Sequence, residues 1–87
     1  MPGSLMIKKI TRSPQFIKAT KHLDSFLLEK LKKQIEKIIE QPDAGKPLKY
    51  RRGERVSYIW PFRLIYAVHG EELILLKFDH RKSVYKD

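Results

Sequence analysis

The sequence predicts an α+β fold of two layers, in which a helical hairpin covers one face of an antiparallel sheet. Three observations predict this fold. A segment in the first half repeats its apolar residues at helical spacing, three short runs in the second half are rich in aromatic and β-branched residues, and one further strand-like run precedes the helices. The predicted order is therefore β-α-α-β-β-β, which places both helices on one side of the sheet.

The first predicted strand runs from residue 6 to 11 and leads directly into a helix. Ser13 is a good N-cap residue, and Pro14 suits the first helical position because it lacks the N–H that would go unpaired there. Apolar residues then recur at three-to-four spacing. The pattern predicts a short helix over residues 14–22.

The second helix is predicted between Asp24, its N-cap, and Gln41-Pro42, which ends it. Leu23 and Leu28 occupy the two positions of a hydrophobic staple. The apolar stripe fits the 3.6-residue period and consists of Leu27, Leu28, Leu31, Ile35, Ile38 and Ile39. The opposite face is charged and is interpreted as a solvated helix face.

After a loop over residues 42–47 the apolar period changes from helical to strand-like. The runs 55–60, 62–68 and 73–79 predict a three-stranded antiparallel meander whose turns lie at Pro61 and at His69-Gly70. The first strand is expected at a sheet edge or beside the last strand.

Composition limits the function classes. The chain has 87 residues, a formal charge of +9 and a pI of about 9.9, which indicates polyanionic partners, with nucleic acid first and an acidic protein second. It has no cysteine, so disulfides, thiolate zinc sites and a cysteine nucleophile are excluded. We expect a cytoplasmic protein with no membrane span, no metal and no small-molecule cofactor. Residues 1–5 are predicted to be a disordered extension, and residues 6–87 a single domain.

Side-chain alternation along the strands predicts where cations meet. Arg55 and Arg63 are expected on the uncovered face of the sheet, and Arg81 follows the next strand, so three guanidinium groups could surround a phosphate. The alternative is that each is a separate surface cation. Trp60 is expected to pack in the core or at a strand edge and not to serve as a stacking platform.

Two further basic groups flank the sheet. Candidate backbone-binding residues precede the meander or follow it, and they are Lys46, Lys49, Arg51, Arg52 and Lys82. A flexible, solvated loop is the alternative for residues 46–52. The chain ends in a cluster in which His80 supplies an imidazole, Arg81 is a planar cation and Tyr85 can stack or transfer a proton. This combination suits RNA, and a solvated terminus is the alternative.

These residues also form patterns that resemble a known family. Lys46-Pro47-Leu48 follows the helical hairpin, Phe62-Arg63-Leu64-Ile65-Tyr66 is similar to a Tyr-Arg-x-x-Tyr strand, and His80-Arg81-Lys82-Ser83-Val84-Tyr85 is similar to a His-Arg-x-x-Val-Tyr ending. From Met6 onward the chain resembles the RelE/ParE toxin superfamily, closest to its RelE-like mRNA interferase branch.

The resemblance implies a toxin that cuts mRNA on the ribosome without a metal and that is inhibited by a cognate RelB-like antitoxin. Arg63 and Arg81 would bind the scissile phosphate, Tyr85 would transfer a proton or stack on a base, and His80 and Arg55 would complete the catalytic group. Ser57 stands where many relatives have a second basic residue, and Glu54 is an alternative base.

The resemblance leaves two other functions open. A ParE-like inhibitor of DNA gyrase shares the fold, and a non-catalytic homologue would act as an antitoxin-binding or RNA-binding module. The sequence does not give the codon preference, the oligomeric state or the identity of the antitoxin.

Overall fold

The computed structural model describes residues 7–80 and 82. Along the chain the elements are β1 (Lys9–Arg12), α1 (Pro14–Thr20), α2 (Ser25–Glu40), the 3-10 helix η1 (Pro42–Ala44), β2 (Lys46–Pro47), β3 (Glu54–Ile59), β4 (Phe62–His69) and β5 (Glu72–His80). The predicted order is confirmed, with the short β2 added inside the predicted loop. The predicted extension at residues 1–5 lies outside the described residues. Within the described residues, no helix has the length and apolar character to cross a membrane.

Both predicted N-caps are present. The side chain of Ser13 accepts a hydrogen bond from the Phe16 backbone N–H at 3.0 Å, and that of Asp24 accepts one from Leu27 at 2.8 Å. The Ser13 hydroxyl also donates to the carbonyl of Leu76 in β5 at 2.6 Å. The cap of α1 is therefore bonded to the sheet as well as to its own helix. This helix ends at Thr20, two residues before the predicted end at residue 22.

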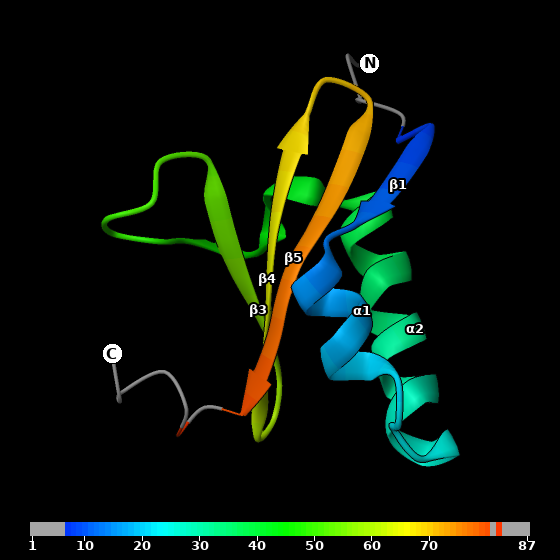
Figure 1. Cartoon of the computed structure of the whole chain (residues 1–87). Helices are drawn as coiled ribbons and strands as arrows, with labels where there is room; N and C mark the ends of the chain where they lie inside the picture. The colour runs from blue at the N-terminus through cyan, green and yellow to red at the C-terminus, as the bar shows by residue number, and fades with distance from the viewer. Residues whose placement is uncertain (1–6, 81, 83–87) are drawn as a thin grey trace.

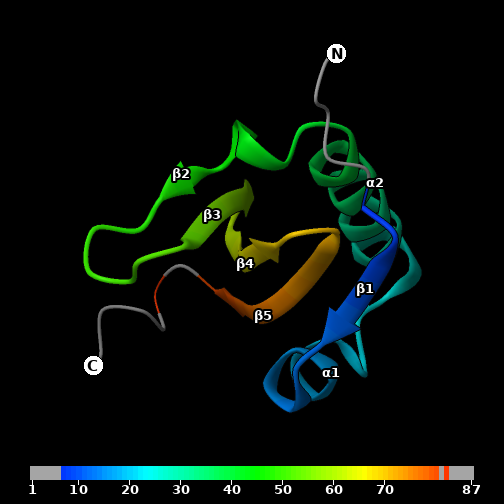
Figure 2. The same ribbon diagram turned by 90° about the horizontal axis from the view of Figure 1, so that it is seen from above.

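The sheet has five strands in the order β1-β5-β4-β3-β2. Figure 1 shows β1, β5, β4 and β3, and Figure 2 shows β2 beside β3. β1 lies at the edge beside the last strand, as expected, but it runs parallel to β5, whereas the other neighbours are antiparallel. The sheet is thus mixed rather than wholly antiparallel. Gly70, with a φ of 62°, occupies the predicted turn between β4 and β5.

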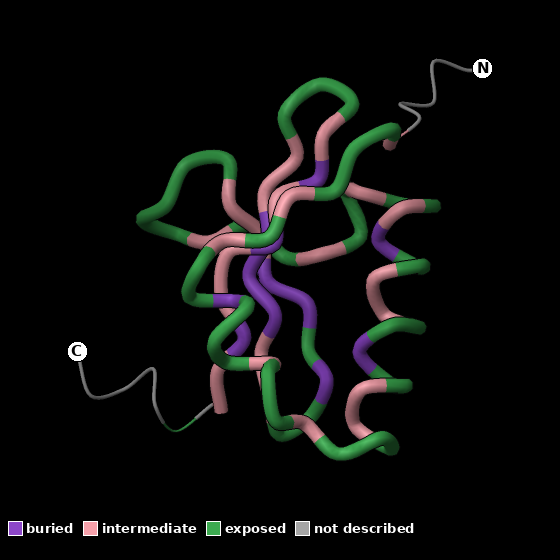
Figure 3. Tube along the Cα trace, turned by 45° about the vertical axis from the view of Figure 1, so that its right-hand side comes forward, coloured by how far each residue is buried: buried purple, intermediate pink, exposed green. Residues whose placement is uncertain are grey.

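The core lies between the helices and one face of the sheet, where buried segments of both layers face each other (Figure 3). The helices contribute Phe16, Leu31 and Ile38, and each is at most 3% exposed. The strands contribute Ile59, Leu64, Tyr66, Leu73, Leu75 and Phe78. The core residues alternate along β4. Along β5 the alternation is interrupted after Leu75, where the register against β4 shifts by one residue, and Phe78 is the next residue on the core face.

Tyr66 and Arg55 fasten η1 and the start of β2 to the sheet, and we call these two side chains the η1 clamp. The Tyr66 hydroxyl donates to the carbonyl of Pro42 at 2.9 Å and accepts from the N–H of Gly45 at 3.1 Å. Arg55 Nη1 donates to the carbonyls of Asp43 at 2.9 Å and Gly45 at 2.6 Å. Four backbone groups of one irregular segment are therefore bonded by two side chains.

Glycine at position 45 allows this close approach. A Cβ there would lie 2.5 Å from the Tyr66 hydroxyl oxygen and 2.9 Å from the carbonyl of Val56. Any larger residue would push the segment away from the sheet. Burial raises the pKa of Tyr66 above its ordinary value of 10.0, partly offset by the Gly45 hydrogen bond and the Arg55 charge and reinforced by Asp43. The hydroxyl is therefore protonated at neutral pH and able to donate.

The clamp predicts that Tyr66→Phe destabilises the fold. The change removes the hydroxyl of a fully buried side chain. The Pro42 carbonyl and the Gly45 N–H then lose their hydrogen bonds to that hydroxyl. We expect a loss of about 1–3 kcal/mol in the free energy of unfolding, measured by urea denaturation. Tyr50→Phe is the matched control, because Tyr50 is 85% exposed. Equal stability of both variants would contradict the clamp.

The raised pKa of Tyr66 predicts an alkaline loss of stability. Above pH 10 the unfolded chain releases the phenolic proton while the folded chain still holds it, so the unfolded state becomes more stable relative to the folded state as pH rises toward the folded pKa. The unfolding free energy should fall more steeply above pH 10 in the parent than in Tyr66→Phe, by at most about 1.4 kcal/mol per pH unit. If the unfolding free energies of the parent and of Tyr66→Phe fall in parallel above pH 10, the raised pKa of Tyr66 is contradicted.

Candidate nucleic-acid interface

The face of the sheet that the helices leave uncovered carries the candidate site. In Figure 2 the helices lie on one side of the sheet, and the loop between β2 and β3 extends on the other. Strand pairing shows which residues share this face, because directly opposed residues point the same way. We call it the open face, and its residues include Lys46, Glu54, Val56, Tyr58, Arg63, Ile65, Ala67, Ile74, Lys77 and Asp79.

One row of the open face has cations at both ends and an apolar floor. Lys46, Val56, Ile65 and Lys77 are opposed in turn across β2, β3, β4 and β5. Val56 and Ile65 are 5% and 6% exposed. Since neighbouring strands are about 4.8 Å apart, the two lysine backbones are separated by roughly 14–15 Å. The row can therefore contact an anionic chain at two points.

The next row places Arg63 between Tyr58 on β3 and Asp79 on β5. Arg63 is half-buried, and its Nε is buried without a hydrogen-bond partner in the described part of the chain. Among the same residues no ion pair joins it to Asp79. A buried guanidinium N–H without a partner is costly, and an anion bound here would supply the missing acceptor. Arg63 is thus a candidate anion-binding group on the open face.

The predicted shared face of Arg55 and Arg63 is wrong. Arg55 is opposed to Tyr66, so it lies on the helix-covered face and belongs to the η1 clamp. The physical reason is the turn between β3 and β4, which consists of two residues, Trp60 and Pro61. With this turn length, odd-numbered residues of β3 share a face with even-numbered residues of β4.

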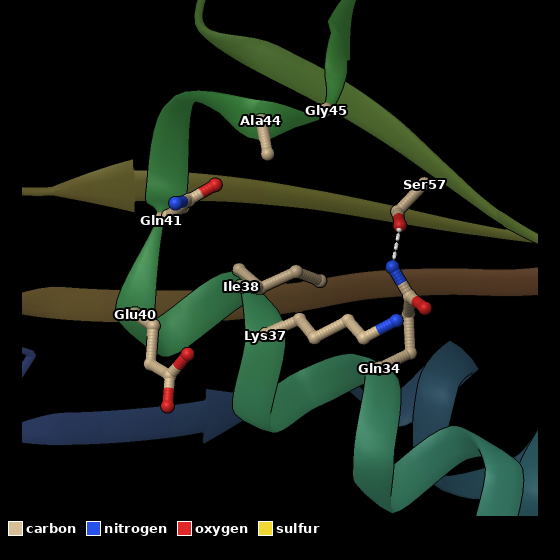
Figure 4. Close-up of a pocket in the computed structure, with 8 residues that line it drawn as sticks. All are labelled: Gln34, Lys37, Ile38, Glu40, Gln41, Ala44, Gly45 and Ser57. Atoms are coloured by element: carbon tan, nitrogen blue, oxygen red, sulfur yellow. Dashed lines mark hydrogen bonds between the residues drawn. The ribbon is translucent and has the colours of Figure 1, made fainter.

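Ser57 lies on the same covered face, 8% exposed, and accepts a hydrogen bond from Gln34 Nε2 of α2 at 2.5 Å. Figure 4 shows this bond at the rim of a cavity of about 330 Å³ between α2, η1 and β3. A cation at position 57 would therefore point at the helix. The open-face neighbour of Arg63 on this strand is Tyr58, so Ser57 does not remove a charge from the open face.

The C-terminal cluster is only partly described. His80 is opposed to Phe62 on the covered face; its ring packs edge-on against that ring at 5.4 Å between centroids, and its Nδ1 accepts from the Lys82 N–H at 3.2 Å. It therefore lies on the opposite face from Arg63. Arg81 and Tyr85 lie outside the described residues, and their catalytic roles stay predictions.

The predicted backbone-binding residues are all exposed at the surface: Lys46, Lys49, Arg51, Arg52 and Lys82. Lys46 is on the open face, and Lys49 Nζ lies 5.4 Å from the centre of the Tyr50 ring. The loop closes through backbone hydrogen bonds, from Leu48 N–H to the Glu54 carbonyl and from Glu54 N–H to the Arg51 carbonyl. Lys49, Arg51 and Arg52 are thus held beside the sheet on a bonded loop, whereas Lys46 is part of β2 and Lys82 follows β5.

Sequence reasoning missed Tyr58 and Lys77 as members of the site. Lys77 and Asp79 alternate with buried Phe78, so a signal for Lys77 was present in the β5 sequence. Tyr58 could be placed only from the β3–β4 register. Trp60 is 63% exposed in the turn directly after β3, so of its two expected positions the core is wrong and the end of a strand remains. Within residues 7–80 and 82, no group of three or more acidic or histidine side chains could hold a metal ion.

Comparison with known proteins identifies the family. Residues 10–85 match the family described as the ParE toxin of the type II toxin–antitoxin system parDE. The chain belongs to the RelE/ParE toxin superfamily. Among curated protein sequences, none shows significant similarity to this toxin.

Solved structures show the same fold at low sequence identity. The toxin is similar to the isolated Escherichia coli RelE toxin, with 18% identity, a TM-score of 0.72, and coverage of 90% of this chain and 96% of that chain. The RelB–RelE complex of Methanococcus jannaschii is similar with 21% identity and a TM-score of 0.70, over 86% of this chain and 94% of that chain. A YoeB/ParE toxin from Agrobacterium tumefaciens is similar with 21% identity and a TM-score of 0.73, over 84% of this chain and 98% of that chain. Fold similarity thus spans the RelE-named and ParE-named relatives alike.

The placement of Arg55 predicts that its removal damages stability. Arg55→Ala deletes two hydrogen bonds to backbone carbonyls, so we expect a loss of about 1–3 kcal/mol in unfolding free energy by urea denaturation. Arg52→Ala, an exposed arginine of the adjacent loop, is the control and should leave stability unchanged. An unchanged stability with lost toxin activity in Arg55→Ala would instead favour the catalytic role predicted from the sequence.

Proposed function

We propose that this toxin is a ribosome-dependent, metal-independent endoribonuclease that cleaves mRNA. The observation that carries the proposal is Arg63, a half-buried cation on the open face whose Nε has no partner in the described residues. The cations of the open face and the adjacent loop extend positive potential around it, as an RNA backbone requires. The proposed substrate places the toxin in the cytoplasm.

In the proposed reaction the 2′-hydroxyl of one nucleotide attacks the adjacent phosphorus and loses its proton to a base. The P–O5′ bond breaks as an acid protonates the leaving 5′-oxygen, and the products are a 2′,3′-cyclic phosphate and a 5′-hydroxyl. Arg63 would stabilise the extra negative charge on the pentavalent phosphorus. Arg81 would be a second phosphate-binding group and Tyr85 the proton-transfer group, both on the resemblance alone.

An antitoxin partner is part of the proposal. Relatives from Methanococcus jannaschii and Escherichia coli have been crystallised as RelB–RelE complexes. The net charge of +9 favours rapid association with an acidic protein segment. We therefore propose that a small acidic antitoxin inhibits this toxin.

Inhibition of DNA gyrase is the second candidate, because the matched family is named for ParE. It requires the fold and a cationic surface but no nuclease centre. A supercoiling assay with purified gyrase separates the two functions: inhibition without mRNA cleavage would establish the second candidate. If the toxin neither inhibits gyrase nor cleaves mRNA, and its expression does not arrest growth, the remaining function is a non-catalytic binding module.

The proposed function predicts that Arg63→Ala loses cleavage. Purified toxin should cut mRNA bound to programmed ribosomes, and loss of a transition-state cation should lower the single-turnover rate by roughly 100-fold or more. Arg12→Ala is the matched control, because Arg12 is an exposed arginine of β1 beside α1. Arg81→Ala and Tyr85→Ala test the two residues proposed by resemblance.

Cleavage by Arg63→Ala at the parent rate would contradict the phosphate-binding role. A urea denaturation curve for each variant separates lost function from lost folding. Cleavage that survives chelation of divalent ions, once the ribosomes are kept intact with polyamines, would support the metal-independent step.

A further inference from the structure

Two aromatic rings beside Arg63 are exposed to a degree that core packing does not explain. Tyr58 is 46% exposed and Trp60 is 63% exposed. Their ring centroids are 5.8 Å apart at an interplanar angle of 72°, so the two rings form an edge-to-face pair. Two exposed aromatic rings in contact at a strand end are a candidate contact for a ligand.

The pair lies next to the proposed phosphate site. Tyr58 is directly opposed to Arg63 across β3 and β4, which sets their Cβ atoms about 4.5–5.5 Å apart. Asp79, on the other side of Arg63, makes that side unfavourable for an anion. A nucleotide whose phosphate binds Arg63 therefore has its nearest flat apolar partner on the Tyr58 side.

We propose that Tyr58 and Trp60 form a stacking platform for one unpaired base of the RNA, next to the phosphate that Arg63 holds. The inference rests on the proposed function and narrows its substrate class to RNA with an unstacked base at that nucleotide. Stacking of a base on an aromatic side chain is worth about 1–3 kcal/mol and needs no specific base edge. A base in a duplex has both faces covered and cannot use the platform.

The surroundings favour RNA over a protein segment as the occupant. Arg63 has a buried N–H without a partner in the described residues, and Lys77 and Lys46 lie in the neighbouring row, so the platform adjoins several sites for phosphate. A nucleic acid offers a π face and a phosphate in each unit. An acidic polypeptide offers charge without a regular flat ring.

The exposed Phe26 of α2 provides a comparison within the same chain. It is 70% exposed, and the Lys30 ammonium lies 4.8 Å from its ring centre. Phe26 therefore matches Tyr58 as an exposed ring beside a cation, but it belongs to the helical layer and not to the open face.

Trp60 is the single tryptophan of the chain, so its fluorescence reports on the platform directly. The protein is titrated with a 2′-O-methyl hexanucleotide, which cannot be cleaved because the attacking hydroxyl is blocked. A hexamer of abasic sugar phosphates has the same charge without bases. We expect the base-bearing hexamer to quench Trp60 and to bind roughly 5-fold to 100-fold more tightly than the abasic one.

The variants identify the side chain responsible. Tyr58→Ala should lose most of the preference for bases over the abasic backbone, Tyr58→Phe should keep it, and Phe26→Ala should bind both probes as the parent does. The proposal is overturned if Tyr58→Ala keeps the full preference, if both hexamers bind equally to the parent, or if poly-L-glutamate quenches Trp60 as strongly as the hexanucleotide. The last result would identify an acidic protein as the occupant.

The binding assay contains no ribosome, so it fails independently of the proposed function. If the platform binds bases but programmed ribosomes show no cleavage, the stacking site stands and the nuclease assignment falls. If programmed ribosomes show cleavage but the parent toxin binds the base-bearing and abasic hexamers equally, the nuclease assignment stands and the platform falls.

Discussion

The pairing of β3 with β4 through a two-residue turn determines which side chains meet the helices and which meet solvent. This register turns Arg55 and Ser57 toward the covered face and leaves Tyr58 and Arg63 together on the open one. A shift of one residue would reverse every one of these positions, because side chains alternate along a strand. The hydrophobic core resists such a shift, since Leu64 and Tyr66 are fully buried only in this register.

The η1 clamp connects the core to the basic loop. Tyr66 belongs to the core by burial, yet its hydroxyl and the Arg55 guanidinium bind the backbone of η1 and Gly45. The loop with Lys49 and Arg51 begins directly after this segment. Tyr66, the last residue of the family-like motif in β4, therefore contributes to the functional surface indirectly. It fixes the segment before the loop, and the cations of that loop remain exposed.

The solved relatives share about a fifth of their residues with this toxin and the same arrangement of strands and helices. At this distance the fold and family are established, whereas the reaction depends on a few side chains of the open face. In the described residues that face combines an arginine without a partner, flanking lysines and an exposed aromatic pair. This combination is the basis of both proposals.

The sequence by itself determined the elements and their order. Ser13 and Asp24 marked the helix starts, the 3.6-residue stripe marked α2, and the aromatic runs marked the strands, because caps and periodicity are local properties of the chain. Tertiary structure decided which cations meet. Strand register, the parallel pairing of β1 with β5 and the clamp on Gly45 depend on contacts between residues far apart in the chain. Local pattern therefore identified Arg63 as a candidate, and only the register separated it from Arg55 and placed it beside Tyr58.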